Sequence, residues 1–171
     1  VEMLFSGEIY DLMSNSLQRK CRLIDCVTLK GSVTPVKLYT IDVNKSIPKG
    51  KSKHKKMSDK EKRAQNEYKK TQMFDDMKKY DKSIDVVYMD KSKGMRNLLK
   101  NPKSEVFLMC FKKGYDNYIK GNWNKAYSLL KQALFIDWND GPTNSLINYI
   151  EQNNKKAPQD WKGYRNLLSK S

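Results

Sequence analysis

The chain has 171 residues, and its 34 Lys and Arg against 19 Asp and Glu give a formal net charge of +15 at pH 7. This length suits one ordinary domain or two small units. The sequence has no run of about 20 apolar residues, which argues against a transmembrane helix, and its three cysteines are too few for a disulfide scaffold.

The first 44 residues carry the signals of one short helix and a β-hairpin. Residues 6–13 have Ser6 as a candidate N-cap and apolar side chains on one helical face. Two runs, Cys21–Leu29 and Pro35–Val43, predict strands, and Lys30-Gly31-Ser32 between them supplies turn residues. Both strands are apolar on both faces, and two strands with one helix cannot bury such a surface alone. We therefore expect further strands from a preceding part of a longer protein.

The cysteines and the single histidine indicate neither a disulfide nor a metal site. Cys21 and Cys26 lie five residues apart in a predicted strand, which would place them on opposite faces and too far apart to pair. Cys110 lies in an apolar helical pattern, and His54 has no cysteine or histidine at ligand spacing. We expect free thiols, no bound metal and no catalytic residue in this chain.

Residues 45–103 are basic and weakly periodic. The run Lys45–Lys56 contains six lysines and no acid, and residues 45–82 carry a net charge of +8, just over half of the total excess. The charge is therefore concentrated in a connector. This run has three interpretations: a solvated linker, a segment that binds an anionic membrane surface, or a segment that binds nucleic acid. No aromatic residue or Arg lies among the lysines, which disfavours nucleic acid.

A helix is predicted over residues 58–80 of this connector. Ser58-Asp59-Lys60-Glu61 has the pattern of a capping box, in which each end of the motif satisfies a backbone N–H of the other. Few apolar side chains share one face of this predicted helix.

Residues 104–171 show strong helical periodicity with aromatic residues. An apolar stripe recurs at steps of three and four residues and resumes in a second helix after Gly121-Asn122. The residues of these stripes are Phe107, Phe111, Gly114 and Tyr118, then Trp123, Ala126, Leu130, Ala133 and Leu134. Asp140-Gly141-Pro142 starts a third helix, because proline is tolerated in a first helical turn. Pro158, followed by Trp161 and Tyr164, predicts a last short helix.

These patterns predict an α+β chain in three parts. Residues 1–44 hold a β-hairpin with a helix, and residues 45–103 hold a basic connector. Residues 104–171 hold a C-terminal helical hairpin with one or two further helices.

The C-terminal helical pair resembles a tetratricopeptide unit that begins at Phe107. Small residues fall where that motif packs its two helices closely. These residues are Gly114, Gly121, Ala126 and Ala133. Tyr118 is one place off the aromatic position of the motif, and Trp138 stands where proline is usual.

The tetratricopeptide resemblance implies a protein partner for the helical tail. Three aromatic residues on the concave side of the helical pair are the candidate contacts: Tyr115, Tyr118 and Trp123. The alternative is that these side chains belong to the intramolecular core.

The hairpin resembles the end of the catalytic domain of class III nucleotide cyclases. That domain typically ends in R-x-I-D-x-V-x-V-K-G followed by P-V-x-V-Y. The corresponding segments here are Cys21-Arg22-Leu23-Ile24-Asp25-Cys26-Val27-Thr28-Leu29-Lys30-Gly31 and Pro35-Val36-Lys37-Leu38-Tyr39. Comparable helical tails follow such domains in many microbial and protist proteins. The resemblance is strong over residues 1–44, looser over 104–168 and absent between them.

The cyclase resemblance implies that Lys30 contacts nucleotide phosphates, as a mobile point charge at a tight turn. The alternative is that Lys30 is only a polar hairpin residue. Asp25 belongs to the hairpin pattern and is interpreted as a supporting carboxylate, not a metal ligand. The family's metal-binding Asp residues and its transition-state Asn and Arg all precede this hairpin. The resemblance thus implies Mg²⁺ or Mn²⁺ for the whole parent only, and a head-to-tail pair of cyclase domains.

The leading hypothesis is the C-terminal portion of a class III adenylate or guanylate cyclase-like protein. Its parent, a phosphorus–oxygen lyase, would form cyclic AMP or cyclic GMP from ATP or GTP in intracellular signalling. This chain alone would not be catalytic. The expected partners are the rest of the cyclase domain, a second cyclase domain and a protein bound by the tail.

Two other hypotheses come from other classes of protein. One is a non-catalytic scaffold that retains a degenerate cyclase remnant. The other is a polybasic adaptor for an anionic membrane or nucleic acid. The expected location is the cytoplasm or the cytoplasmic side of a membrane-attached parent.

Overall fold

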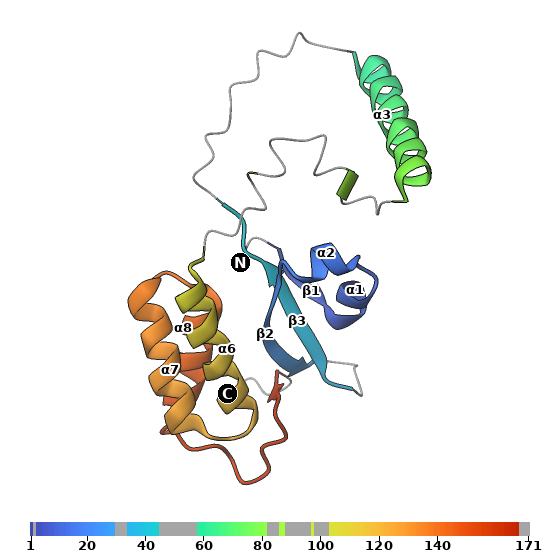
Figure 1. Cartoon of the computed structure of the whole chain (residues 1–171). Helices are drawn as coiled ribbons and strands as arrows, with labels where there is room; N and C mark the ends of the chain where they lie inside the picture. Colours follow the sequence, from blue (N-terminus) through green and yellow to red (C-terminus); the bar gives the residue numbers. More distant parts are fainter. Residues whose placement is uncertain are drawn as a thin grey trace.

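The computed structural model describes residues 1, 3–29, 34–44, 58–81, 86–87, 97 and 103–167 (Figure 1). The fold is mixed α+β, as the sequence predicts. The described elements are β1 (Phe5–Ser6), α1 (Gly7–Asp11), α2 (Asn15–Gln18), β2 (Cys21–Thr28), β3 (Val36–Ile41), α3 (Asp59–Tyr80), α6 (Glu105–Ile119), α7 (Trp123–Ile136), α8 (Gly141–Gln152) and β4 (Arg165–Asn166).

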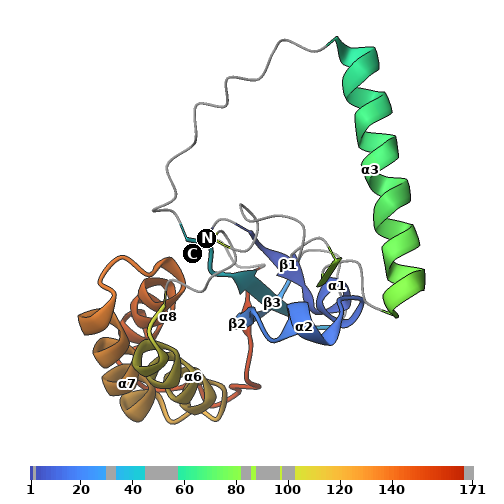
Figure 2. The same ribbon diagram turned by 45° about the horizontal axis from the view of Figure 1, so that its top comes forward.

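One sheet in the order β1-β3-β2-β4 forms the centre of the described fold. The predicted hairpin is confirmed: β2 and β3 pair antiparallel, from Cys21 opposite Ile41 to Val27 opposite Val36. The helices α1 and α2 lie beside β1 and β3, whereas α6 and α8 lie on the side of β2, with α7 beyond them (Figures 1 and 2). The helix predicted over residues 6–13 is shorter, because α1 ends at Asp11.

An extra residue in β2 changes which side chains share a face. The register shifts between Leu23 and Asp25, so Ile24 is inserted without an opposite residue on β3. Cys21 pairs with Ile41 and Cys26 with Lys37. Ile41 and Lys37 are four residues apart in a regular strand, so Cys21 and Cys26 lie on the same face. The prediction that they lie on opposite faces is wrong, because the bulge reverses the alternation between them.

Helices of the same chain supply part of the surface that buries the hairpin. Ile24, 7% exposed, belongs to one hydrophobic cluster with Phe107, Leu146 and other buried residues of α6, α7 and α8. The predicted parts 1–44 and 104–171 therefore share a core. Some of the cover that we expected from further strands comes from these helices and from the two-residue strands β1 and β4.

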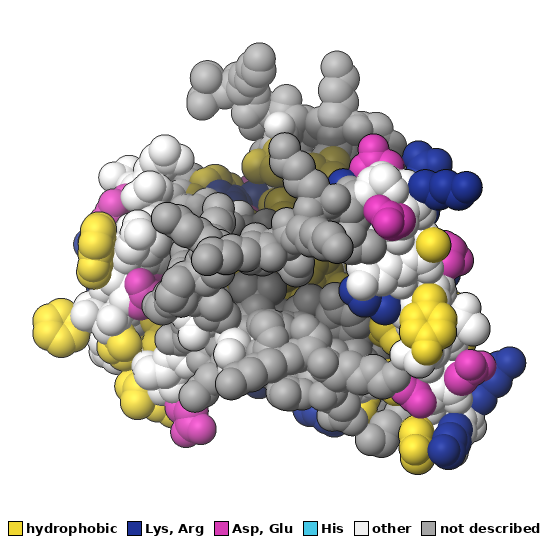
Figure 3. Space-filling model, turned by 90° about the horizontal axis from the view of Figure 1, so that it is seen from above, with side chains coloured by type: hydrophobic (Ala, Val, Ile, Leu, Met, Phe, Trp, Pro, Cys, Tyr) yellow, Lys and Arg dark blue, Asp and Glu magenta, His cyan; other side chains and the backbone are white. Residues whose placement is uncertain are grey.

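The helix predicted over residues 58–80 is present as α3. Its capping box is formed: the Ser58 side chain accepts from the N–H of Glu61, and the Glu61 carboxylate accepts from the N–H of Ser58 at 2.8 Å. No residue of α3 is buried, and α3 stands apart from the sheet and the other helices (Figures 1 and 2). Acidic, basic and hydrophobic side chains intermingle on its surface (Figure 3). No helix within the described ranges is long and apolar enough to cross a membrane.

The helices α6 and α7 form the predicted helical hairpin. They approach each other closely at Gly114, which has no Cβ: a Cβ there would lie 2.8 Å from Cγ of Leu130. Gly121 ends the turn after α6 with a φ of 80°, a backbone conformation that favours glycine. The third predicted helix is α8, which has Pro142 in its first turn and Asp140 as its N-cap.

The last predicted helix, after Pro158, does not form. Residues 165–166 are instead the strand β4, which pairs parallel with Val27 and Thr28 of β2. Gly163 has a φ of 85°, which is incompatible with a right-handed helix. The indole N–H of Trp161 donates to backbone carbonyls at the end of α6, which holds this segment against another element. The contacts of this segment with α6 and β2 thus decide its structure, and the short apolar pattern that predicted a helix does not.

Candidate functional site between the hairpin and the helices

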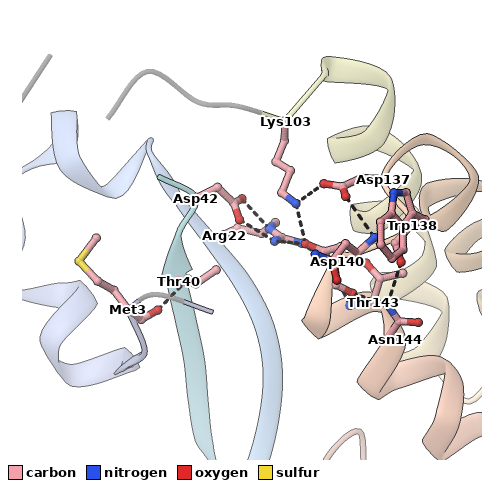
Figure 4. A network of polar contacts seen from close by, with 11 residues as sticks. Met3, Arg22, Thr40, Asp42, Lys103, Asp137, Trp138, Asp140, Thr143 and Asn144 are labelled. Carbon is pink, nitrogen blue, oxygen red and sulfur yellow. Dashed lines mark hydrogen bonds and ion pairs between the residues drawn. The ribbon is translucent and has the colours of Figure 1, made fainter. Parts of the chain in front are cut away.

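A buried arginine joins the hairpin to the helical region (Figure 4). Arg22 of β2 donates from Nε and Nη2 to the carboxylate of Asp42, just after β3, at 2.8 and 2.7 Å. Its Nη1 and Nη2 also donate to the carboxylate of Asp140, at 3.2 and 2.8 Å. The guanidinium carbon lies 4.5 Å from the ring centroid of Phe111. One cation therefore links the hairpin with the N-cap of α8 over an aromatic ring.

Asp140 is the most heavily engaged carboxylate of this site. Besides Arg22, it accepts from the backbone N–H of Thr143 at 3.0 Å and from the Thr143 hydroxyl at 2.5 Å. Lys103 Nζ lies 3.0 Å from its Oδ1. Burial alone would raise the pKa of Asp140, but the hydrogen bonds and charge of Arg22, with the hydrogen bonds from Thr143, lower that pKa well below its ordinary value of 3.8.

Lys103 is the second cation of the cluster around Asp140. It forms ion pairs with Asp137 and Asp140, and its side chain is 14% exposed. Burial opposes the charged form of Lys103, yet hydrogen bonds to Asp137 and Asp140 raise its pKa. A cleft of about 280 Å³ lies beside the cluster, with Asn44 and Asn139 also in its lining.

A second buried pair lies at the other end of β2. Asp25 is 4% exposed and forms an ion pair with Arg165 of β4. The backbone N–H of Cys26 donates to Asp25 Oδ1 at 2.9 Å. Burial raises the pKa of Asp25, and the charge of Arg165 offsets this only in part. The guanidinium carbon of Arg165 also lies 5.1 Å from the ring centroid of Tyr149 in α8.

The two clusters link the hairpin to the C-terminal region. Asp25 and Asp140 are each bound by a cation, so neither is a free general base. Within the described ranges no group of three His, Cys, Asp or Glu could hold a metal. The carboxylates around Asp140 do not fit Mg²⁺ or Mn²⁺, because Arg22 and Lys103 already neutralise them and would repel a further cation. We assign no metal-dependent step to them.

The cysteines are free thiols, as predicted. Burial raises the pKa of the Cys21 thiol to about 11, so it is protonated near pH 7. A protonated thiol is a poor nucleophile and metal ligand.

The residues predicted from sequence as binding residues have different outcomes. Lys30 lies outside the described residues, as do His54 and the Lys45–Lys56 run. The aromatic candidates Tyr115, Tyr118 and Trp123 are 5%, 0% and 1% exposed. Their contact with a protein stays a prediction, and their position corresponds to the alternative of an intramolecular core.

These aromatic side chains are covered by the chain itself. The ring centroids of Tyr118 and Trp123 are 5.6 Å apart, and that of Trp161 lies 5.0 Å from each. Burial raises the pKa of the Tyr115 and Tyr118 hydroxyls. Tyr118 and Trp123 thus pack against Trp161 of the same chain.

Sequence reasoning missed the pairing of Arg22 with Asp140 and of Asp25 with Arg165. The partners are 118 and 140 residues apart in the chain. A partial signal was present, because a charge inside a strand that is apolar on both faces needs a partner when buried. That signal could indicate that Arg22 and Asp25 are paired, but not with which residues.

Comparison with known proteins found no family model, curated protein or solved structure that matches the chain. The sequence pattern of the hairpin and the contacts described above are therefore what bears on the function of the chain.

Proposed function

We propose that the chain is the C-terminal portion of a class III nucleotide cyclase-like protein. In this proposal residues 1–44 are the last hairpin of the catalytic domain, and the helical region is docked on that hairpin. The parent joins the 3′-oxygen of ATP or GTP to the α-phosphorus, with loss of pyrophosphate and of the hydroxyl proton. The protein acts in the cytoplasm or on the cytoplasmic side of a membrane.

The observation that carries this proposal is the hairpin that bears the cyclase-like pattern. Residues 21–28 and 36–41 pair antiparallel, as that pattern requires. The two charged residues of its R-x-I-D segment, Arg22 and Asp25, are both buried and each is bound by a counter-charge of the helical region or of β4. The hairpin and the tail are therefore complementary, which supports a protein in which they occur together.

Within this proposal Lys30 binds nucleotide phosphates and the described carboxylates perform no chemistry. The metal-binding carboxylates belong to the preceding part of the catalytic domain. This chain alone is then inactive, and it becomes part of an active site only together with that domain and a second cyclase domain.

The test is a cyclase assay on the longest natural polypeptide that contains this chain. We expect it to form cyclic AMP or cyclic GMP with Mg²⁺ or Mn²⁺, and the 171-residue chain to form neither. Lys30→Ala should raise the KM for the nucleotide, and Lys37→Ala, an exposed lysine of β3, is the matched control. A longer polypeptide without cyclase activity would contradict the proposal. Unchanged kinetics in Lys30→Ala would remove Lys30 from the phosphate site.

A non-catalytic scaffold is the second candidate, and exposed aromatic residues at the end of α7 favour it. Phe135 is 93% exposed and Trp138 is 80% exposed. Hydrophobic side chains also project from the outer edge of the helical region in the space-filling view (Figure 3). Such residues are typical of protein interfaces. If the longer polypeptide is inactive, a partner cross-linked to wild type but not to Phe135→Ser with Trp138→Ser would support this candidate.

A further inference from the structure

Another cleft lies over the sheet, between α6 and the residues that join α2 to β2. The helices α2 and α6 stand on opposite sides of the β2–β3 hairpin (Figures 1 and 2). Side chains of the hairpin itself, among them Leu23 and Tyr39, line the cleft between these helices. Its volume of about 400 Å³ falls within the range of small-molecule sites in proteins. The size of the cleft therefore suits a small ligand.

Aromatic side chains line this cleft on both sides. The rings of Tyr10 in α1 and Tyr39 in β3 are stacked, with centroids 4.1 Å apart and planes 10° from parallel. Phe111 and Tyr115 of α6 are also stacked, with centroids 6.4 Å apart, and both are buried. Tyr10 and Tyr39 are only half-buried, so theirs are the ring surfaces that a ligand reaches. Such surfaces favour a ligand with a planar ring.

The charges of the lining favour an anion. Three of its cations form no ion pair or side-chain hydrogen bond within the described part of the chain. These residues are Arg19, Lys20 and Lys112. A fourth cation, Arg22, is bound to Asp42, which also lines the cleft. Among the described residues of the lining, Asp116 is the only carboxylate without a bound cation. The cleft thus has three free cations against one free carboxylate.

We propose that this cleft binds a small anion with a planar ring, of the class of nucleoside monophosphates. The ring stacks on Tyr10 or Tyr39, and the phosphate lies among Arg19, Lys20 and Lys112. Arginine can hold two phosphate oxygens at once, and lysine supplies a mobile point charge. This inference goes beyond the proposed function and does not depend on it, because the site is made of described residues and performs no chemistry.

The first test is calorimetric titration of the 171-residue chain with AMP at about 0.15 M salt, where weak surface attraction is largely screened. We expect a single AMP site. Adenosine lacks the phosphate and ribose 5-phosphate lacks the ring, so each should bind at least about tenfold more weakly. Equal affinity for AMP and ribose 5-phosphate would show that no ring is recognised, and no AMP binding would overturn the whole proposal.

A pair of double variants tests the cations. Arg19→Ala with Lys20→Ala should weaken AMP binding by at least about tenfold, because two of the three free cations are removed. Lys120→Ala with Lys162→Ala removes two exposed lysines outside the lining and should leave the affinity unchanged. The Lys45–Lys56 run is intact in both proteins. Unchanged affinity in the first double variant would therefore place AMP on another basic segment and contradict the proposal.

Asp116→Asn tests the same site by a gain of affinity. It removes the free carboxylate of the lining, so AMP should bind about two- to fivefold more tightly, the size of an exposed charge interaction. Asp116 is exposed on α6, and the fold should be unaffected. Unchanged or weaker binding would contradict the position of the phosphate beside α6.

Amide hydrogen exchange of the wild-type chain tests the location without any substitution. AMP should slow exchange in peptides that cover residues 10–23 and 108–116, since both segments line the cleft. Peptides of α8 (residues 141–152) contribute no lining residue and should be unaffected. Slower exchange confined to residues 45–56 would show that AMP binds the basic run instead, and it would overturn the proposal.

Discussion

Arg22 is a charged residue that stays buried because four favourable contacts replace its hydration. Two carboxylates accept its hydrogen bonds and two rings, of Phe107 and Phe111, lie under its guanidinium group. Burial by itself lowers the pKa of Arg22, but hydrogen bonds to Asp140 and Asp42 reverse this and raise it. The residue is therefore charged throughout the pH range in which the protein is folded.

Removal of Arg22 should destabilise the protein strongly. In Arg22→Met the volume of the side chain is largely kept, but Asp42 and Asp140 are left buried without their main counter-charge. Breaking a buried pair in this way costs about 3–5 kcal/mol of unfolding free energy, which urea unfolding would measure. Arg63→Met on the exposed surface of α3 is the control and should be near neutral. A similar small effect in both variants would show that the cluster around Arg22 contributes little.

Asp140 should make stability depend on pH in the acid range. Its pKa in the folded protein is below the ordinary value of 3.8, so its contribution is complete above about pH 4 and is lost as the pH falls further toward the folded pKa. Asn at position 140 does not ionise, so Asp140→Asn has no such contribution to lose as the pH falls. The unfolding free energy of wild type should therefore exceed that of Asp140→Asn at pH 7, and the difference should shrink below pH 4.

Asp25 should change the stability of the protein with pH in the opposite direction to Asp140. Its pKa is raised, so its charged form costs stability at pH 7, and that cost disappears as the pH falls through its folded pKa. Urea unfolding of wild type, Asp140→Asn and Asp25→Asn between pH 7 and 3 separates the two contributions. A difference between wild type and Asp140→Asn that did not change with pH would contradict the ion-pair account of Asp140.

Among the elements, the contact between α6 and α7 is the most sensitive to side-chain volume. A Cβ at Gly114 would lie 2.8 and 2.9 Å from Cγ and Cδ2 of Leu130, and 3.3 Å from its backbone N. The Leu130 side chain or the helix backbones must therefore shift to admit even one methyl group.

Gly114→Ala should lower the unfolding free energy by about 1–3 kcal/mol, despite the better helix propensity of alanine. Gly141→Ala in α8 is the matched control, since nothing lies within 4 Å of a Cβ there, and it should be neutral or stabilising. Thermal unfolding of both variants distinguishes the two effects. Equal stability of the two variants would show that α6 and α7 tolerate a wider separation.

The elements that sequence reasoning predicted well are those specified by local signals. The capping box at Ser58 and the apolar stripes of α6 and α7 need no information from distant residues. The bulge at Ile24 and the strand β4 depend on partners elsewhere in the fold, and neither leaves a periodic pattern in the sequence. The hairpin also has local signals and could be predicted. The ion pairs that define the candidate site join residues far apart in the chain and could not.

At the scale of the whole molecule, the hairpin and the helical region should unfold together. Ile24 shares a hydrophobic cluster with α6, α7 and α8, and two buried ion pairs link β2 to residues of the C-terminal region. Tryptophan fluorescence reports on the helical region, because all three tryptophans lie between residues 123 and 161. Amide exchange of residues 21–29 reports on the hairpin.

The two probes should give the same urea midpoint, as expected for one cooperative unit. The helix α3 has no buried residue, so its amide exchange should not follow that transition. A lower midpoint for the hairpin than for tryptophan fluorescence would mean that the interface between them is weaker than its contacts imply.

The parallel pairing of β4 with β2 also affects how the protein is made. Arg165 leaves the ribosome 140 residues after Asp25, so β2 emerges long before the strand and the counter-charge that complete it. During that interval the edge of β2 is open and Asp25 has no partner. Open strand edges invite pairing with other chains, and contacts this distant in sequence form late. Newly made protein should therefore depend on chaperones until residues 161–167 have been synthesised and have docked.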